Sequence, residues 1–413
     1  MFDQIGANAQ RAARKLASLD TAAKNEALRA MADELDRSVE TVLAANDLDM
    51  EDARAQSIGE ALLDRLALDG DRVAAIANGL RKVASLPDPV GSLTGGWTFE
   101  NGIHLQRTRV PLGVVAVIYE ARPNVTADAA GLCFKSGNAA LLRGSSYTLR
   151  SNNAIADVLR SVLADRGLPM DAIQLVQDTS RSAATALMQA KQWVDLLVPR
   201  GGPNLIAAIE ENATVPYVID GAGNCHVYVD ASADLEMAAD IVFNAKTQRP
   251  GVCNAAEKLV VHEDVAREFL PVIGKRLLEH GVELRGDAGA VAILDGIREA
   301  TTSDWPTEYV DLIMAIKVVP SLDAAIDHVR EYSSGHTEAI VTSDLESADR
   351  FVRETDSAVV LVNASTRFTD GEEFGFGAEI GISTQKLHVR GPMGLEALTT
   401  EKYILHGKGQ IRS

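Results

Sequence analysis

Cysteine is scarce in this sequence: among 413 residues there are three, Cys133, Cys225 and Cys253. An odd and low number of cysteines in a long chain argues against a disulfide framework and for reduced thiols, which are usual in the cytosol. We therefore expect a cytoplasmic protein whose fold does not depend on disulfide bonds.

Other features are also missing. Aromatic residues make up only 5% of the chain, so the core must be built from Ala, Val, Leu and Ile. The N-terminal segment lacks the apolar run of a signal peptide, and no apolar stretch of about eighteen residues predicts a membrane span. Lys and Arg number 40 against 58 Asp and Glu, a net charge of −18, which disfavours nucleic acid and anionic membranes as partners. A local arginine cluster or a helix N-terminus could still bind an anionic small molecule.

The length predicts two or three domains. Residues 1 to 87 have helical spacing of apolar residues, clearest in 27–43 and 61–83. From Val110 onward, short apolar runs alternate with helical segments, and a second such series begins near His226. Repeated β-α units predict an α/β fold with two open, mostly parallel α/β domains. Segments 216–220 and 290–294 are among the predicted strands.

A hairpin is predicted at Asn101-Gly102, which separates two largely polar, β-prone arms. Asn-Gly is a strong hairpin signal because both turn positions of a type I′ turn need positive φ. Neither arm can bury a face alone, so the hairpin either pairs with another subunit or is a simple surface hairpin. The sequence leaves both open.

The usual dinucleotide fingerprint is absent, since its nearest match, GFGAEI at 375–380, has Ile380 where the third glycine should stand. Two glycine turns at predicted strand ends could bind phosphate instead, through backbone N–H groups at a helix N-terminus. They are LLRGS, with Arg143, Gly144 and Ser145, and VPRGG, with Arg200, Gly201 and Gly202. From base rates alone, a plain β-α connection is the more common role of such turns.

The three cysteines differ in their surroundings. Cys133 lies on an apolar helix face and is interpreted as a small buried hydrophobe. Cys225 and His226 are neighbours in a predicted strand, so they point to opposite faces and cannot form a dyad. Together with Cys253 and His262 they lack the spacing of a zinc site, and no metal is expected.

Cys253 lies in NAKTQRPGVCNAAEKLVVH, after a helix end and before residues 254–257, which could start a helical turn. A thiolate is favoured at a helix N-terminus by the local dipole and free N–H groups. Cys253 is therefore a candidate nucleophile, although a structural role is equally open from the chemistry alone.

The segments PLGVVAVIYEARPNVT, NAALLRGS, GNCHVYVD and NAKTQRPGVCNAAEKLVV, with the late glycine tract, together resemble the aldehyde dehydrogenase superfamily. Within it the chain is similar to the branch of γ-glutamyl phosphate reductases. The resemblance implies NADPH-dependent reduction of γ-glutamyl phosphate to glutamate-5-semialdehyde through a cysteine thioester, in proline biosynthesis from glutamate.

The resemblance also implies roles for individual residues. Cys253 falls on the catalytic cysteine, and Asn124 on the asparagine that helps form the oxyanion hole. The positions that would bind the cofactor are Arg143, Gly144, Ser145, Gly201 and Gly202. An arginine and a hydroxyl near the ribose could hold a 2′-phosphate, so NADPH is expected over NADH.

The substrate carries a phosphate and a carboxylate, and cationic residues near the mapped site are candidates to bind them: Arg122, Lys246 and Arg249. Hydrolytic members of the superfamily carry a water-activating glutamate, where this chain has Asp220 or nothing. That departure weakens, without excluding, the alternative of a hydrolytic semialdehyde dehydrogenase that forms a free acid. A non-catalytic binding protein on the same fold is the other alternative.

The resemblance divides the chain into three parts. Residues 1–97 and 111–224 would form the cofactor-binding domain, 225–395 the catalytic domain, and 98–110 with 396–413 an oligomerisation hairpin and tail. We expect a homodimer or homotetramer, a functional link to glutamate 5-kinase, and no nucleic-acid or membrane partner.

Overall fold

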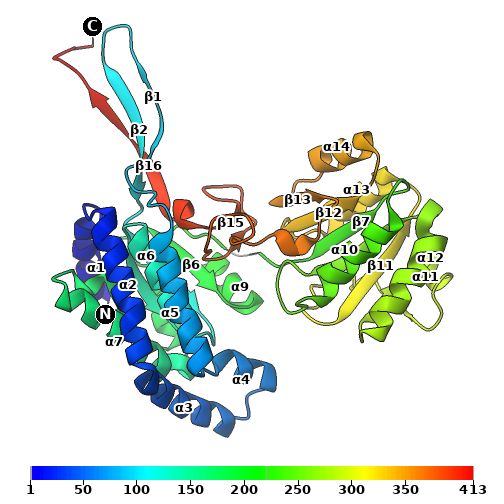
Figure 1. Ribbon diagram of the computed structural model, residues 1–413, viewed down its shortest axis with the longest axis horizontal. Helices are drawn as coiled ribbons and strands as arrows, with labels where there is room; N and C mark the ends of the chain where they lie inside the picture. The colour runs from blue at the N-terminus through cyan, green and yellow to red at the C-terminus, as the bar shows by residue number, and fades with distance from the viewer. Residues whose placement is uncertain (1, 220, 413) are drawn as a thin grey trace. The chain divides into compact units, whose positions relative to one another are not determined.

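The structure is a computed structural model that describes residues 2–219 and 221–412 (Figure 1). The chain divides into two compact units. Unit 1 comprises Met1–Ile219, Phe376–Gly381 and Met393–Ser413, and unit 2 comprises Asp220–Gly375 and Ile382–Pro392. The chain thus crosses between units more than once, and each unit is described by itself.

Unit 1 contains a parallel sheet with the strand order β5-β4-β3-β6. Its central strand β3 (Val114–Tyr119) is buried along its whole length, and burying one aliphatic side chain of this kind stabilises the fold by about 1.5–3 kcal/mol. The other strands are β4 (Ala139–Arg143), β5 (Ile173–Leu175) and β6 (Leu196–Arg200). The connecting helices are α6 (Asn124–Lys135), α7 (Leu149–Asp165), α8 (Arg181–Met188) and α9 (Pro203–Asn212).

The N-terminal segment is helical, as its apolar spacing predicts. It forms α1 (Phe2–Leu16), α2 (Thr21–Arg37), α3 (Val39–Ala55), α4 (Glu60–Leu66) and α5 (Gly70–Ser85). Helix α2 packs against α5 and α7, and α5 packs against α6, so these helices extend the core of unit 1 (Figure 1). Their buried side chains are mainly Ala, Leu, Met, Val and Ile, consistent with the low aromatic content.

A small antiparallel sheet in unit 1 has the order β1-β2-β16, formed by β1 (Leu93–Thr98), β2 (His104–Pro111) and β16 (Thr399–His406) (Figure 1). The hairpin at Asn101-Gly102 is confirmed, but its predicted turn type is wrong. Gly102 has a φ of 83°, whereas the φ of Asn101 is not positive. The Asn101 Oδ1 accepts a hydrogen bond from the Ile103 N–H at 3.2 Å. The N–H of Gly102 donates to the Phe99 carbonyl at 2.9 Å, so the turn places only its glycine in the left-handed region.

Unit 2 is built on a parallel sheet with the order β10-β9-β11-β8-β7-β12-β13. The strands are β7 (Cys225–Val229), β8 (Ala256–His262), β9 (Glu283–Gly286), β10 (Arg298–Glu299), β11 (Ile313–Val319), β12 (Thr337–Val341) and β13 (Val359–Val362). The short pair β14 (Ile382–Ser383) and β15 (Gly391–Pro392) is antiparallel. The prediction of two mostly parallel α/β sheets is confirmed.

Side chains of unit 2 alternate between two cores, as the period of a strand requires. Val227 and Val229 of β7 pack with helices α10 (Leu235–Thr247) and α11 (Glu263–Glu279). Tyr228 packs on the other side with residues of α13 (Leu322–Tyr332) and α14 (Leu345–Glu354). Helices therefore cover both faces of this sheet (Figure 1).

Two predicted strands are wrong. Segment 290–294 belongs to helix α12 (Ala288–Val291) and the turn after it, because the Asp287 side chain caps the helix by accepting from the Ala290 N–H at 2.9 Å. A short apolar run cannot by itself distinguish a strand from a buried helical turn. In segment 216–220, Tyr217 makes only an isolated bridge with Leu197, and Asp220 lies outside the described residues.

Candidate active site

Cys253 lies in a turn of unit 2 between the end of α10 and the start of β8. Its side chain is half-buried. The prediction that a helix starts after it is wrong: residues 254 and 255 continue the turn, and β8 begins at Ala256. The segment Ala256–His262 is a strand because it pairs with both β7 and β11. Any activation of the Cys253 thiol must therefore come from neighbouring groups other than a helix dipole.

The backbone of this turn is held from below by the segment that leads into β7. The Cys225 Sγ lies 3.2 Å from the Cys253 carbonyl oxygen and donates to it. A Cβ on Gly223 would lie 1.6 Å from the same carbonyl oxygen, so only glycine fits at this position. Gly223 and Cys225 thus fix the position of the turn that carries the Cys253 thiol.

Cys225 itself is unsuited to be the nucleophile. It is fully buried, and burial, with the nearby Glu338 carboxylate, raises the pKa of its thiol well above the usual value. Its strand neighbour His226 points elsewhere, with Nδ1 2.9 Å from Glu338 Oε2. The prediction that these two side chains form no dyad is confirmed, as is the buried position of Cys133, whose pKa burial raises to about 12.

A short 3-10 turn, η3 (Thr366–Phe368), is tied to the cysteine turn by side-chain hydrogen bonds. The Ser365 hydroxyl donates to Asn244 Oδ1 on α10 at 2.7 Å, and the Asn254 amide donates to the Thr369 carbonyl at 2.8 Å. These bonds connect residues on both sides of Cys253 to η3. They bring a segment far away in the sequence to the site.

Arg367 on η3 lies near the cysteine turn, a position that the sequence did not predict. Its Nε donates to Gln248 Oε1 at 2.6 Å. Burial and the neighbouring Arg249 lower the pKa of Arg367, while Asp370, Cys253 and Glu373 act in the opposite direction. Arg367 therefore lies within electrostatic range of both Arg249 and Cys253, a proximity that no local sequence pattern reveals.

Lys246 occupies a different environment from the one expected of a substrate-binding residue. Its side chain is fully buried, with Nζ 3.3 Å from Glu257 Oε2. Burial lowers the pKa of Lys246 and raises that of Glu257, and each charge partly offsets the shift of the other. Glu257 also accepts the backbone N–H groups of Tyr309 and Val310. Arg249, three residues further along the chain, is exposed.

In unit 1, Asn124 is the first residue of α6 and is exposed. Its Nδ2 donates to Asp128 Oδ2 at 2.8 Å, one helical turn later. Burial raises the pKa of Asp128 to about 6, and the bond from Asn124 and the charge of Arg200 limit the rise. Arg122 is half-buried and lies in the connection just before Pro123 and α6.

The predicted cofactor residues of unit 1 gather at one sheet edge. Register pairs Ile118 of β3 with Arg143 of β4, and Tyr119 of β3 with Arg200 of β6, so the turns after all three strands leave from the same edge. Ligands of open α/β sheets bind at this carboxyl edge. Gly144, Ser145, Gly201 and Gly202 all lie in these turns.

The Arg143 side chain is nearly buried and donates through Nη2 to the carbonyls of Thr179 and Ser180, at 2.6 and 2.9 Å. Its buried Nε has no hydrogen-bond partner in the described part of the chain. Burial lowers the pKa of Arg143, with a smaller opposing effect from Asp178. Gly144 next to it has no room for a side chain, since a Cβ would lie 2.1 Å from Asn152 Nδ2.

The turn at Gly201-Gly202 leads into α9, with Gly202 at the N-cap and Pro203 first in the helix. The Gly202 N–H donates to Glu120 Oε2 at 3.0 Å. A Cβ on Gly201 would lie 2.7 Å from the same oxygen, so the exposed Glu120 carboxylate lies directly against this turn. A carboxylate is thus bound where a helix N-terminus can accept a phosphate.

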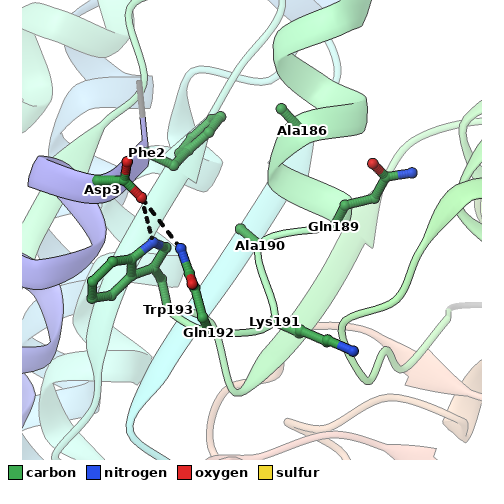
Figure 2. Close-up of a pocket in the computed structure, with 8 residues that line it drawn as sticks. All are labelled: Phe2, Asp3, Ala186, Gln189, Ala190, Lys191, Gln192 and Trp193. Carbon is green, nitrogen blue, oxygen red and sulfur yellow. Dashed lines mark hydrogen bonds between the residues drawn. The ribbon is translucent and has the colours of Figure 1, made fainter.

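A pocket elsewhere in unit 1 lies between the start of α1 and the segment before β6 (Figure 2). There Asp3 Oδ1 accepts hydrogen bonds from Trp193 Nε1 and Gln192 Nε2, both at 3.2 Å. Its lining contains none of the predicted site residues. Across residues 2–219 and 221–412, no cluster of His, Cys, Asp and Glu is arranged to hold a metal ion, and no helix is long and apolar enough to cross a membrane.

Comparison with known proteins adds to this geometry. The family described as "Aldehyde dehydrogenase family" matches residues 1–290. Gamma-glutamyl phosphate reductases of Heliobacterium modesticaldum and Moorella thermoacetica are each 56% identical over 407 residues, which cover 98% of this chain and 98% and 97% of theirs. The crystal structure of gamma-glutamyl phosphate reductase from Thermotoga maritima superposes with a TM-score of 0.98 at 47% identity and covers 99% of both chains.

Proposed function

The chain belongs to the aldehyde dehydrogenase family, and from this premise we propose that it reduces γ-glutamyl phosphate to glutamate-5-semialdehyde and phosphate with NADPH. The reaction is the second step of proline biosynthesis from glutamate. The observation that carries the proposal is the correspondence over 99% of both chains with a solved γ-glutamyl phosphate reductase. A cytoplasmic enzyme with a functional link to glutamate 5-kinase fits this role.

Cys253 is the proposed nucleophile. Its thiolate attacks the acyl carbon of γ-glutamyl phosphate, the bond from carbon to the phosphate oxygen breaks, and a thioester remains on the sulfur. Phosphate is a good leaving group, so no strong general acid is needed at this step. When bound, the nicotinamide cofactor supplies the hydride that reduces the thioester. Collapse of the resulting thiohemiacetal releases the semialdehyde and returns the Cys253 thiolate.

Asn124 is proposed to stabilise the oxyanion that forms during this attack, together with the backbone N–H of Cys253. One hydrogen of its amide is bonded to Asp128, which fixes the orientation of the side chain and leaves the second hydrogen to donate. Loss of one oxyanion donor typically lowers the rate about 100- to 1000-fold. Asp128 therefore acts here by positioning Asn124.

The carboxyl edge of the unit 1 sheet fits a phosphorylated nucleotide. The α9 N-terminus offers the Gly202 N–H, and Gly201 allows the chain to approach closely. The buried Nε of Arg143 is a donor without a partner among the described residues, which favours an acceptor such as a 2′-phosphate nearby. Arg143, Gly144, Ser145, Gly201 and Gly202 are accordingly proposed to hold NADPH in preference to NADH.

Arg122 and Arg249 are proposed to bind the anionic groups of the substrate. Lys246, whose ammonium is paired with Glu257, is proposed to act indirectly by supporting the cysteine turn. Unit 1 is accordingly proposed to bind the cofactor and to supply Arg122 and Asn124, and unit 2 to supply the nucleophile Cys253.

The antiparallel sheet of unit 1 is proposed to pair with a second copy of the chain. Both of its outer strands, β1 and β16, have a free edge within the described residues. It also exposes large apolar side chains: Leu93, Trp97, Phe99, Tyr403 and Leu405. An exposed edge and apolar surface of this kind favour strand pairing between subunits, which gives a homodimer or homotetramer.

A steady-state assay of semialdehyde oxidation with NADP⁺, with and without phosphate, tests the proposed function. We expect turnover to require phosphate, because the sequence has Asp220 where the hydrolytic members carry a glutamate, and an aspartate is one methylene shorter and reaches a water less well. Sustained activity without phosphate would favour the hydrolytic alternative. Cys253→Ala is expected to abolish NADPH oxidation with the acyl phosphate, and intact activity would instead indicate that another residue is the nucleophile.

A further inference from the structure

We propose that Arg367 and Arg249 together form the site for the phosphoryl group, binding the leaving phosphate in acyl-phosphate reduction and the attacking phosphate in the reverse direction. This inference rests on the proposed function and deepens it by assigning the phosphate to two named arginines of unit 2. Arg367 comes from η3, and Arg249 from the segment between α10 and Cys253.

The two arginines are brought together by Gln248, because Arg367 Nε donates to Gln248 Oε1 at 2.6 Å and Arg249 is the next residue in the chain. In the described part of the chain, Arg249 makes no ion pair, and the only side-chain hydrogen bond of Arg367 is to the neutral amide of Gln248. Two neighbouring guanidinium groups repel each other, and partial burial of Arg367 adds to this cost. A doubly charged anion between them removes the repulsion.

Arg367 is held in place for such a role. Its backbone N–H donates to the Ser365 hydroxyl, which in turn donates to Asn244 on α10. The side-chain bond to Gln248 uses Nε and leaves both Nη groups of the fork free to point at a ligand. A guanidinium fork matches two oxygens of a phosphate.

The position also distinguishes phosphate from the second anionic group of the substrate. The bond from the Asn254 amide to the Thr369 carbonyl, at 2.8 Å, holds the Arg367 segment beside Cys253, so the charge of Arg367 acts close to the carbon that the thiolate attacks. In γ-glutamyl phosphate the phosphoryl oxygen is bonded to that carbon, whereas the α-carboxylate is several bonds away. Asp370 and Glu373 are also near Arg367 and would repel an anion, and the positive charge of Arg249 offsets this repulsion.

In the reverse direction the step is balanced without any further reagent. A phosphate oxygen forms a bond to the thioester carbon, the bond from carbon to Cys253 sulfur breaks, and the thiolate leaves. The proton of hydrogen phosphate passes to solvent, and nothing is oxidised or reduced. The two arginines lower the cost of bringing the dianion to the thioester next to the departing thiolate.

The test is the steady-state KM for inorganic phosphate in semialdehyde oxidation, measured for Arg367→Gln, Arg249→Gln and a control. We expect each variant to raise the KM for phosphate about 10- to 100-fold, since a charge-assisted hydrogen bond is lost, while the KM for semialdehyde changes less than about twofold. Arg267→Gln, an exposed arginine of α11 in the same unit, is expected to change neither value. Arg367→Lys should recover part of the loss.

A rapid-mixing measurement separates this inference from the proposed function. Without phosphate, Arg367→Gln should still give the wild-type burst of NADPH, because thioester formation precedes phosphate attack; the burst also shows that the variant is folded. If the variants have an unchanged KM for phosphate, or a raised KM for semialdehyde alone, the inference is wrong. The proposed function still holds in that case as long as the turnover of the wild-type enzyme depends on phosphate. If the turnover of the wild-type enzyme does not depend on phosphate, both the inference and the proposed function are wrong.

Discussion

Asp128, proposed to position Asn124, lowers stability at neutral pH. Its carboxylate accepts a hydrogen bond from the Asn124 amide at 2.8 Å, but burial raises its pKa from 3.8 to about 6. A carboxyl group whose pKa is higher in the folded state contributes most to stability while protonated, below the unfolded value, and this contribution is lost as pH rises through about 6. At neutral pH the charged group is therefore a local source of instability.

Asp128→Asn should accordingly raise the free energy of unfolding at pH 8 by about 1–2 kcal/mol, less than the full pKa shift implies because the side chain is only half-buried. Below pH 4 the gain should disappear, because Asp128 is then protonated in both states. Thermal unfolding across this pH range measures the effect, with Asp157→Asn at an exposed position of α7 as the control. A gain that is equal at pH 8 and pH 4 contradicts the assignment.

Sequence could identify some residues of the site and not others. Cys253 is recognisable from its segment, but the turn around it ends in a strand because β7 and β11 flank Ala256–His262. Lys246 looks like a free cation in the sequence, whereas the fold buries it against Glu257. Arg367 has no local signal at all, since its relation to Cys253 depends on hydrogen bonds from η3 to Asn244 and Asn254.

At the scale of elements, the start of α9 combines two features that compete. Its N-terminus is suited to a phosphate, yet the Gly202 N–H is bonded to the Glu120 carboxylate. Both anions need the same donor, so the carboxylate must move away when a pyrophosphate binds there. The glycine turn was predictable from the sequence. The contact of Glu120 with this turn was not, because Glu120 reaches it from the end of another strand.

Glu120→Gln should therefore bind NADPH more tightly, with a Kd about two- to fivefold lower, because an exposed ionic contact is worth at most about 1 kcal/mol. Fluorescence titration of the reduced cofactor measures this directly. Glu211→Gln, which removes another exposed carboxylate near the opposite end of α9, is the matched control and should leave the Kd unchanged. Weaker binding by Glu120→Gln would mean that the carboxylate itself contacts the cofactor.

Elements with long periodic patterns were the most predictable. The parallel strands and their helices follow from continuous apolar runs and helical spacing, and both sheets confirm them. The failures are short: residues 290–294 are held in α12 by the Asp287 cap, and the Asn101-Gly102 turn puts only Gly102 at positive φ. In each case a local hydrogen bond decided between conformations that the apolar pattern could not separate.

At the scale of the whole molecule, the β1-β2-β16 sheet is the proposed contact surface between subunits. Trp97 on β1 and Tyr403 on β16 are 55% and 59% exposed, whereas a tryptophan is usually highly buried in a folded protein. The low aromatic content of the chain makes such exposure more informative. Contact with a second copy would cover these side chains.

The double variant Trp97→Asp/Tyr403→Asp is expected to convert the oligomer to monomer, because charges replace apolar contacts at the subunit interface. Light scattering coupled to gel filtration gives the mass of each species. Leu345→Asp, at an 82% exposed position of α14, is the control and should leave the mass unchanged. An unchanged mass for the double variant would place the interface elsewhere.

The central claim is that Cys253 carries the acyl group until phosphate removes it. The most direct measurement is mass spectrometry of the enzyme mixed with semialdehyde and NADP⁺ in phosphate-free buffer, followed by peptide mapping. The account predicts one glutamyl adduct per chain, on the peptide that contains Cys253, and its disappearance when phosphate is added. An adduct on Cys225 or Cys133, or no phosphate-sensitive adduct at all, would contradict it.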